Sequence, residues 1–173
     1  MWWPAVGLPL MVLLGWVVGD GSTPIDDWFQ QARGSALRWL LFFTDYRTVG
    51  VILAATIALA LFRRRWLLAG VAVLTPVVAV QLARVCKGLF GRWKGDGLAY
   101  PSGHTTLMVV VLGMVILVVG AGLWVVLGSV VFGLLGVVGQ SVTYHYFTDA
   151  VGAVLLGTSL VCIVAAIVER RRP

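Results

Sequence analysis

Long apolar runs alternate with short polar segments along the whole chain. A membrane-spanning helix needs about 20 mostly apolar residues, and somewhat shorter ones are tolerated. Six runs approach this length, at residues 3–19, 47–62, 66–85, 104–121, 122–143 and 149–168. Because backbone groups in lipid must form hydrogen bonds within their own segment, each run is predicted to be a helix and not a strand. The pattern predicts an all-α membrane protein, a bundle of six transmembrane helices forming one domain over residues 1–173.

Composition supports this interpretation. Hydrophobic residues make up 60% of the 173 residues and charged residues only 12%, and the mean hydropathy is +0.98. Soluble domains contain roughly a quarter charged residues, so a water-soluble fold does not fit. The apolar N-terminal stretch has no basic region before it, which favours a first span over a cleaved signal peptide.

The first polar segment, residues 20–46, is itself partly apolar. Ser22 or Thr23 can cap a helix that has Pro24 in its first turn. An apolar stripe follows at Trp28, Phe29, Ala32, Ala36, Leu37 and Leu40. We expect an amphipathic helix on the membrane surface between the first two spans. A loop packed on the bundle is the alternative.

Basic residues cluster at two places in a chain whose net charge is +6. The clusters are Arg63–Arg65 and Arg170–Arg172, and such clusters mark cytoplasmic ends of spans. With six spans, both fall on the cytoplasmic side, and loops 20–46, 86–103 and 144–148 fall on the other. The chain has no basic soluble face with interleaved aromatic residues, so nucleic acid is not an expected partner.

One loop on the non-cytoplasmic side is nevertheless basic. It carries Lys87, Arg92 and Lys94, whose side chains are suited to binding phosphate oxygens. Ser102 adds a hydroxyl, and Gly103 allows a ligand to approach the backbone at the start of the next helix, where free N–H groups favour an anion. These residues are candidates for binding a phosphate group.

The chain contains two histidines, and both border this side of the bundle. His145 and Asp149 are four residues apart, so the carboxylate can fix the ring tautomer and leave the other nitrogen free for nucleophilic attack. His104 can act as a general acid. The structural alternatives are a helix cap at residues 101–104 and a buried polar pair at His145 and Asp149. A metal site of two histidines and one aspartate is a further alternative, which the neighbouring cations disfavour.

At these residues the sequence resembles the type 2 phosphatidic acid phosphatase (PAP2) superfamily. That family has three motifs: Lys-x6-Arg-Pro, Pro-Ser-Gly-His and Ser-Arg-x5-His-x3-Asp. The second is complete at residues 101–104, and the third retains His145 and Asp149. The first begins at Lys87 and reaches Lys94 in place of arginine.

The chain departs from the family pattern at further positions. Gly95 replaces the proline of the first motif, and Val138 and Gly139 stand where the third has Ser-Arg. A phosphate-binding arginine is therefore missing, and Arg92 or Arg84 are candidates to replace it in space. Lysine does not reproduce the bidentate contacts of arginine.

The resemblance implies a lipid phosphatase that needs no metal or other cofactor. His145 would form a phosphohistidine intermediate, Asp149 would orient it, and His104 would protonate the leaving oxygen. The phosphoryl oxygens would be held by Lys87, Lys94, Ser102 and Gly103. Expected substrates are membrane lipid phosphates or diphosphates: polyprenyl phosphates, phosphatidate-like lipids, phosphatidylglycerophosphate or a phosphoribosyl polyprenyl lipid. The protein would span the plasma membrane several times, with its active site on the extracytoplasmic side.

Two other classes of function remain open from the sequence. A catalytically degenerate protein of the same fold would bind a lipid phosphate or a partner enzyme. A small transporter is less favoured, because no internal repeat is visible. The glycine-rich stretch 133–139 can mediate helix contacts within the bundle or in a homo-oligomer.

Overall fold

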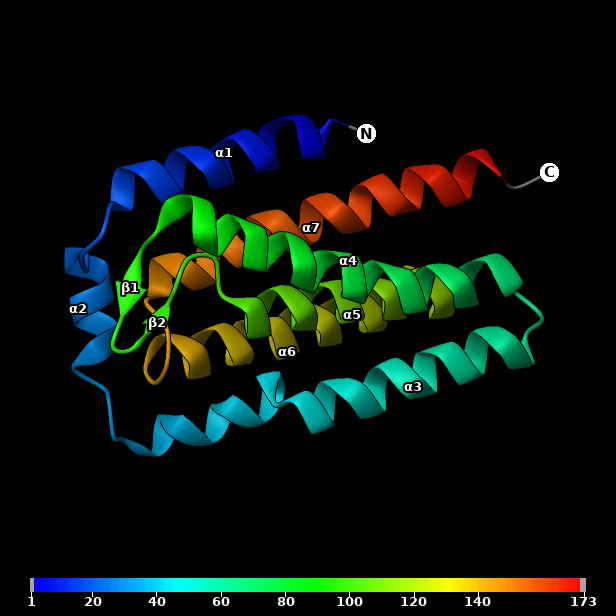
Figure 1. Cartoon of the computed structure of the whole chain (residues 1–173). Coiled ribbons are helices and arrows are strands. Elements are labelled where there is room, and N and C mark those ends of the chain that lie inside the picture. The colour runs from blue at the N-terminus through cyan, green and yellow to red at the C-terminus, as the bar shows by residue number, and fades with distance from the viewer. Residues whose placement is uncertain (1, 172–173) are drawn as a thin grey trace.

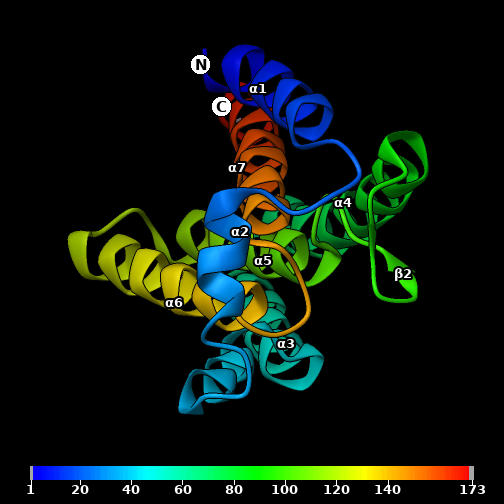
Figure 2. The same cartoon turned by 90° about the vertical axis from the view of Figure 1, so that its left-hand side faces the viewer.

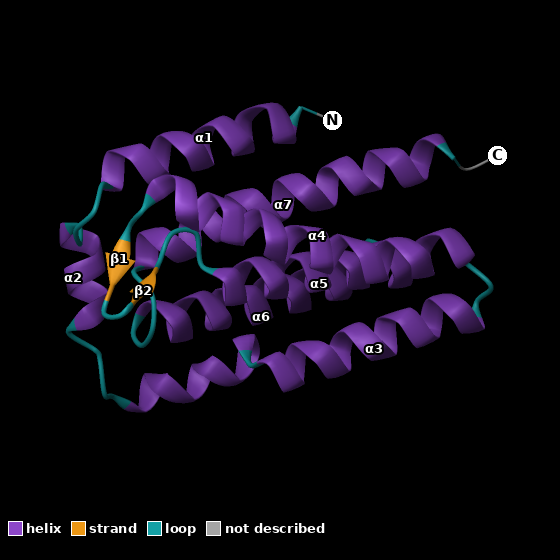
Figure 3. Cartoon of the chain, viewed as in Figure 1, coloured by secondary structure: helices purple, strands orange, loops and turns teal. Residues whose placement is uncertain are grey.

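The computed structural model describes residues 2–171, and helices account for most of them (Figures 1 and 3). The elements are α1 (Trp3–Val18), α2 (Pro24–Gln30), the 3₁₀ helix η1 (Ala36–Thr44), α3 (Tyr46–Phe62), α4 (Trp66–Phe90), β1 (Trp93–Lys94), β2 (Gly97–Leu98), α5 (Gly103–Val119), α6 (Leu123–Ser141) and α7 (Phe147–Arg170). The two short strands form an antiparallel hairpin between α4 and α5.

The long helices run along a common direction, so the connecting segments gather at two opposite ends (Figure 1). One end holds the α3–α4 turn and the C-terminal end of α7, and there Arg63 and Arg65 donate to the Val118 carbonyl over 3.3 and 3.1 Å. The other end holds α2, the β1–β2 hairpin and the α6–α7 loop. Arg63–Arg65 and the described part of the second cluster, Arg170 and Arg171, thus lie opposite the predicted functional loops, as the sequence predicts. Which end faces the cytoplasm stays a prediction.

Helix α5 lies at the centre of the bundle and contacts α3, α4, α6 and α7. Small residues let it approach α7 closely: a Cβ added at Gly157 would lie 2.8 Å from the Val109 side chain, and one at Gly113 would overlap Val161. Such close approach is typical of membrane helices, where packing and not hydrophobic burial drives association. Large apolar side chains cover the outside, with Trp16 and Trp124 72% and 82% exposed. Lipid is the natural environment for such a surface.

A helix corresponds to each of the six predicted spans, with ends that differ by a few residues. Within residues 2–171, four helical segments are long and apolar enough to cross a membrane, namely Ala36–Phe62, Trp66–Phe90, Leu123–Ser141 and Phe147–Arg170. These segments mark the chain as a membrane protein. The apolar helices α1 and α5 have 16 and 17 residues, about 24–26 Å at 1.5 Å per residue, which is less than a typical hydrocarbon core. Full crossing by α1 and α5 therefore stays a prediction.

The single amphipathic helix predicted between the first two spans is replaced by two short helices. Thr23 caps α2 and Pro24 is its first residue, as expected. Gly34 then takes a positive φ of 84°, and Ser35 begins η1 by accepting from the Leu37 amide. The chain turns because glycine adopts this conformation without strain. Helix α2 lies across the end of the bundle, whereas η1 packs along α6 (Figure 2).

Candidate active site

Hydrogen bonds join the three predicted functional segments at one end of the bundle. The Lys94 ammonium donates to the His145 carbonyl over 2.7 Å, which ties the hairpin to the α6–α7 loop. The Ser102 amide donates to the Asp149 carbonyl over 3.1 Å, which ties the Pro-Ser-Gly-His turn to the start of α7. The sequence-based expectation that these segments meet is confirmed.

His145 and Asp149 form a close pair just before and within the first turn of α7. The His145 Nδ1 lies 3.5 Å from Asp149 Oδ2, and the carboxylate is fully buried. The same oxygen accepts from the Tyr146 amide over 2.9 Å, as a residue in the first turn of a helix often does. His145 Nδ1 has no aligned hydrogen-bond partner among the described residues. Because Nδ1 faces the carboxylate, Nε2 is the nitrogen left for a ligand.

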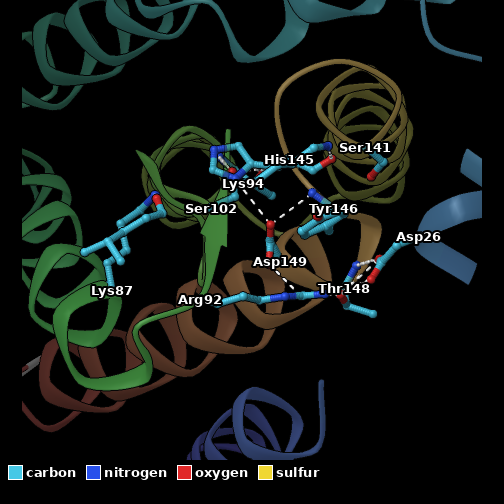
Figure 4. Close-up of polar contacts among 12 residues, drawn as sticks. Asp26, Lys87, Arg92, Lys94, Ser102, Ser141, His145, Tyr146, Thr148 and Asp149 are labelled. Atoms are coloured by element: carbon cyan, nitrogen blue, oxygen red, sulfur yellow. Dashed lines mark hydrogen bonds and ion pairs between the residues drawn. The ribbon is translucent and has the colours of Figure 1, made fainter. Parts of the chain in front are cut away.

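Behind Asp149, on the side away from His145, lies the buried guanidinium of Arg92 (Figure 4). It donates to Asp149 Oδ1 over 2.8 Å and to Asp26 Oδ2 over 2.9 Å. It also donates to the Thr148 hydroxyl once and to the Gly21 carbonyl twice. These five bonds engage all five N–H donors of an arginine. The prediction that Arg92 binds substrate directly does not fit this geometry, because no donor faces an open space.

Asp26 completes this buried group, and the sequence reading did not assign it a role in the site. The Thr148 amide and hydroxyl both donate to its carboxylate, at 2.9 Å and 2.9–3.0 Å. Burial alone would raise the pKa of Asp26, but hydrogen bonds from Thr148, Thr23 and Arg92 outweigh it and bring the pKa below its ordinary value. Its position in a Thr-Pro-Ile-Asp capping sequence predicts the start of a helix. It does not predict a contact with Thr148, which lies 122 residues further along the chain in α7.

Lys94 lies close to His145, whereas Lys87 lies to one side. The Lys94 ammonium is 4.5 Å from the Tyr146 ring, as well as bonded to the His145 carbonyl. Burial lowers the pKa of Lys94 to about 8, although the charge of Asp149 acts in the opposite direction. Lys87 extends from α4 and donates to the Leu98 carbonyl on the hairpin. Figure 4 shows its side chain apart from the cluster around His145.

The Pro-Ser-Gly-His turn forms the N-terminus of α5. Ser102 caps the helix by accepting from the Thr105 amide at 3.4 Å, so the cap predicted as an alternative is present. A Cβ at Gly103 would meet nothing within 4 Å, which leaves open space before the first backbone amide. The His104 ring packs against the Tyr46 ring with centroids 4.4 Å apart. His104 lies within electrostatic range of His145 and Lys87.

The structure explains the arginine missing at position 139. Gly139 lies on α6 where η1 crosses it, and a Cβ there would be 2.5 Å from the Leu40 carbonyl carbon. Backbone atoms cannot move aside cheaply, so no larger side chain fits. The other suggested replacement, Arg84, is exposed on α4, and among the described residues it forms no ion pair with Asp26, Asp149 or any other carboxylate.

The bundle contains two cavities of similar size, of which one borders the site. One, of about 370 Å³, lies between η1, α5 and α6 and includes His104 and Gln140 in its wall. The other, of about 340 Å³, lies between α5, α6 and α7 and is lined almost wholly by apolar side chains such as Leu112 and Val130. Among residues 2–171, no three His, Cys, Asp or Glu side chains gather as a metal ligand set.

Comparisons with known proteins match this arrangement to one fold. No family model matches the sequence, and no curated protein matches it. A solved structure, a transmembrane PAP2-type phosphatidylglycerolphosphate phosphatase from Bacillus subtilis, superposes with a TM-score of 0.83. The chain has the PAP2 phosphatase fold. The superposition covers 99% of this chain and 98% of the other at 16% sequence identity. The resemblance found in the sequence is thereby confirmed at the level of the fold.

Proposed function

We propose that the protein is a lipid phosphatase that uses His145 as its nucleophile. The observation that carries this proposal is the buried Asp149 carboxylate facing His145 Nδ1 at 3.5 Å, beside Lys94, in a PAP2 fold. A carboxylate on one ring nitrogen orients the imidazole and stabilises its positive form, which makes the other nitrogen an effective nucleophile. The position of this group at one end of a bundle of apolar helices supports a lipid phosphate as the substrate.

The proposed reaction assigns one role to each histidine. His145 Nε2 attacks the phosphorus, the bond from phosphorus to the leaving oxygen breaks, and His104 donates a proton to that oxygen. Water then attacks the phosphohistidine while His104 accepts a proton from it. Inorganic phosphate leaves, and both histidines return to their starting forms. General acid and base catalysis of this kind contributes about 10²–10⁴-fold.

Other groups bind the phosphate or hold the catalytic residues in place. Lys94, the Gly103 amide and Ser102 would hold the phosphoryl oxygens, and Lys87 would add positive charge from α4. Preorganised donors of this kind usually make a large contribution to the rate, because they stabilise charge in the transition state. Arg92 acts through Asp149 as a positioning residue, because all its donors are bonded to protein groups.

The charge pattern favours one orientation of the protein in the membrane. The end that bears Arg63–Arg65 would face the cytoplasm, by the excess of basic residues there. The catalytic end would then open on the extracytoplasmic side of the plasma membrane. The expected partners are the lipid substrate and the surrounding membrane lipids.

The test is phosphate release by the purified protein in detergent containing EDTA, with a panel of lipid phosphates. We expect release by the wild type and a loss of at least about 10³-fold in the His145→Ala variant, as for a removed nucleophile. His104→Ala should slow the reaction less for substrates with good leaving groups. Equal activity of wild type and His145→Ala would refute the mechanism. If the folded wild-type protein releases phosphate from no lipid, the chain is the non-catalytic lipid-binding alternative.

A further inference from the structure

The cavity between η1 and α6 has a polar wall beside the predicted general acid. Its lining includes Arg38, Trp39 and Asp45 from the η1 region, His104 from α5, and Gln140 and Tyr144 from the α6 end. Its volume of about 370 Å³ is within the range of small-molecule sites. The proposed mechanism uses only His104 from this group.

Gln140 belongs to this wall and has a buried acceptor without a partner among the described residues. Its side chain is buried, at 2% exposure, and its Nε2 donates to the Thr44 hydroxyl over 2.7 Å. Thr44 in turn donates its proton to the Leu41 carbonyl, so it can only accept from Gln140. The amide orientation is therefore fixed, and Oε1 is left without a partner among the described residues. A buried acceptor without a donor costs free energy unless a ligand or water supplies one.

Arg38 gives the same cavity a positive charge. It is two residues from Leu40, whose backbone occupies the space that a side chain at position 139 would need. Helix η1 therefore leaves no space for an arginine at position 139 of α6, and it carries an arginine of its own at position 38. Arg38 is exposed and lies 5.7 Å from the Trp39 ring. Its guanidinium is available to an anion, because the described structure records no ion pair to it.

The proposed role of His104 indicates which part of the substrate would enter this cavity. His104 protonates the leaving oxygen, so the leaving group lies on the His104 side of the phosphorus, opposite His145. Asp45, which also lines the cavity beside His104, already accepts from the Arg47 and Thr48 amides, whereas the Gln140 acceptor and the Arg38 cation have no partner among the described residues. A leaving group that satisfies both carries a hydroxyl and an anion.

From these observations we infer a leaving-group site formed by Gln140 and Arg38. Its ligand is a polyol that bears the terminal phosphate and is joined to the lipid by a phosphodiester. Gln140 Oε1 accepts from a hydroxyl of the polyol, and Arg38 pairs with the phosphodiester. Glycerol and a sugar are the two polyols that fit this description. The inference rests on the proposed function and refines its substrate class.

The experiment compares kcat/KM for four lipids in the wild type. Phosphatidylglycerophosphate and a phosphoribosyl polyprenyl lipid carry a polyol and a phosphodiester, phosphatidate carries neither, and polyprenyl diphosphate carries an anion but no hydroxyl. We expect at least one polyol lipid to exceed phosphatidate by about tenfold or more, since a charged hydrogen bond contributes about that much. The better of the two identifies the polyol as glycerol or sugar.

Two variants and two matched controls locate the selectivity. Arg38→Gln should lower the ratio of polyol-lipid to phosphatidate kcat/KM by about tenfold, and Gln140→Met by about two- to tenfold. Arg84→Gln and Gln81→Met change exposed residues of α4 and should leave the ratio at its wild-type value. Should Gln140→Met fail to fold, the exposed Arg38 still provides the test.

Two results would overturn the inference without touching the proposed function. One is phosphatidate hydrolysis as fast as that of both polyol lipids, with activity still dependent on His145. The other is an equal loss on all four lipids in Arg38→Gln and Gln140→Met, which would indicate general damage. If no lipid is hydrolysed in a His145-dependent manner, the proposed function fails and this inference falls with it.

Discussion

Replacement of Arg92 by methionine tests the buried group behind the candidate nucleophile. Arg92 holds two fully buried carboxylates, Asp26 and Asp149, at 2.9 and 2.8 Å. Methionine replaces the apolar stem of arginine but has no donor, so both carboxylates lose their counter-charge while they stay buried. Breaking a buried pair in this way costs about 3–5 kcal/mol of unfolding free energy. Arg92→Lys keeps the charge with three donors in place of five and should cost about 1–3 kcal/mol.

The assay is reversible unfolding in mixed detergent micelles at neutral pH, with kinetics measured on the same preparations. Arg84→Met is the control, because an exposed arginine without such contacts should change stability by less than about 0.5 kcal/mol. A positioning role predicts that kcat falls in Arg92→Lys while KM changes little. The reasoning is refuted if Arg92→Met costs less than about 1 kcal/mol, the average for any substitution. A raised KM with unchanged kcat would instead place Arg92 in contact with substrate.

Three further predictions concern charge and packing. Burial lowers the pKa of Lys94 to about 8, so kcat/KM for lipid phosphate should fall as pH rises through about 8. In Lys94→Arg this fall should be absent, since arginine stays protonated. Folding lowers the pKa of Asp26 from 3.8. The carboxylate therefore contributes its full stabilisation above pH 3.8 and loses it as pH falls through the folded pKa. The free energy of unfolding measured against pH should show this loss in the wild type and not in Asp26→Asn. Gly139→Ala places a Cβ 2.5 Å from backbone of Leu40 and should destabilise the protein by about 1–3 kcal/mol, whereas Gly128→Ala, with nothing within 4 Å, should not lower the melting temperature.

Sequence periodicity and local motifs were sufficient to predict the helical architecture. Apolar runs of span length predict helices because unpaired backbone groups are too costly in lipid, and each predicted run is a helix in the structure. The positions of His104, His145 and Asp149 next to span ends also indicated that they would meet. Spacing along the chain determines such contacts when the residues are four apart or lie at ends of packed helices.

Contacts between distant segments could be decided only by the tertiary structure. The partners of Arg92 include Asp26 and Asp149, 66 and 57 residues away, and nothing in the local sequence of any of them specifies the others. The 20–46 segment has a helical stripe, yet Gly34 breaks it and η1 docks on α6. That docking closes position 139 and brings Arg38 beside Gln140 and His104. Local propensity is a sum over neighbours in sequence, whereas these contacts depend on which helix faces meet after packing.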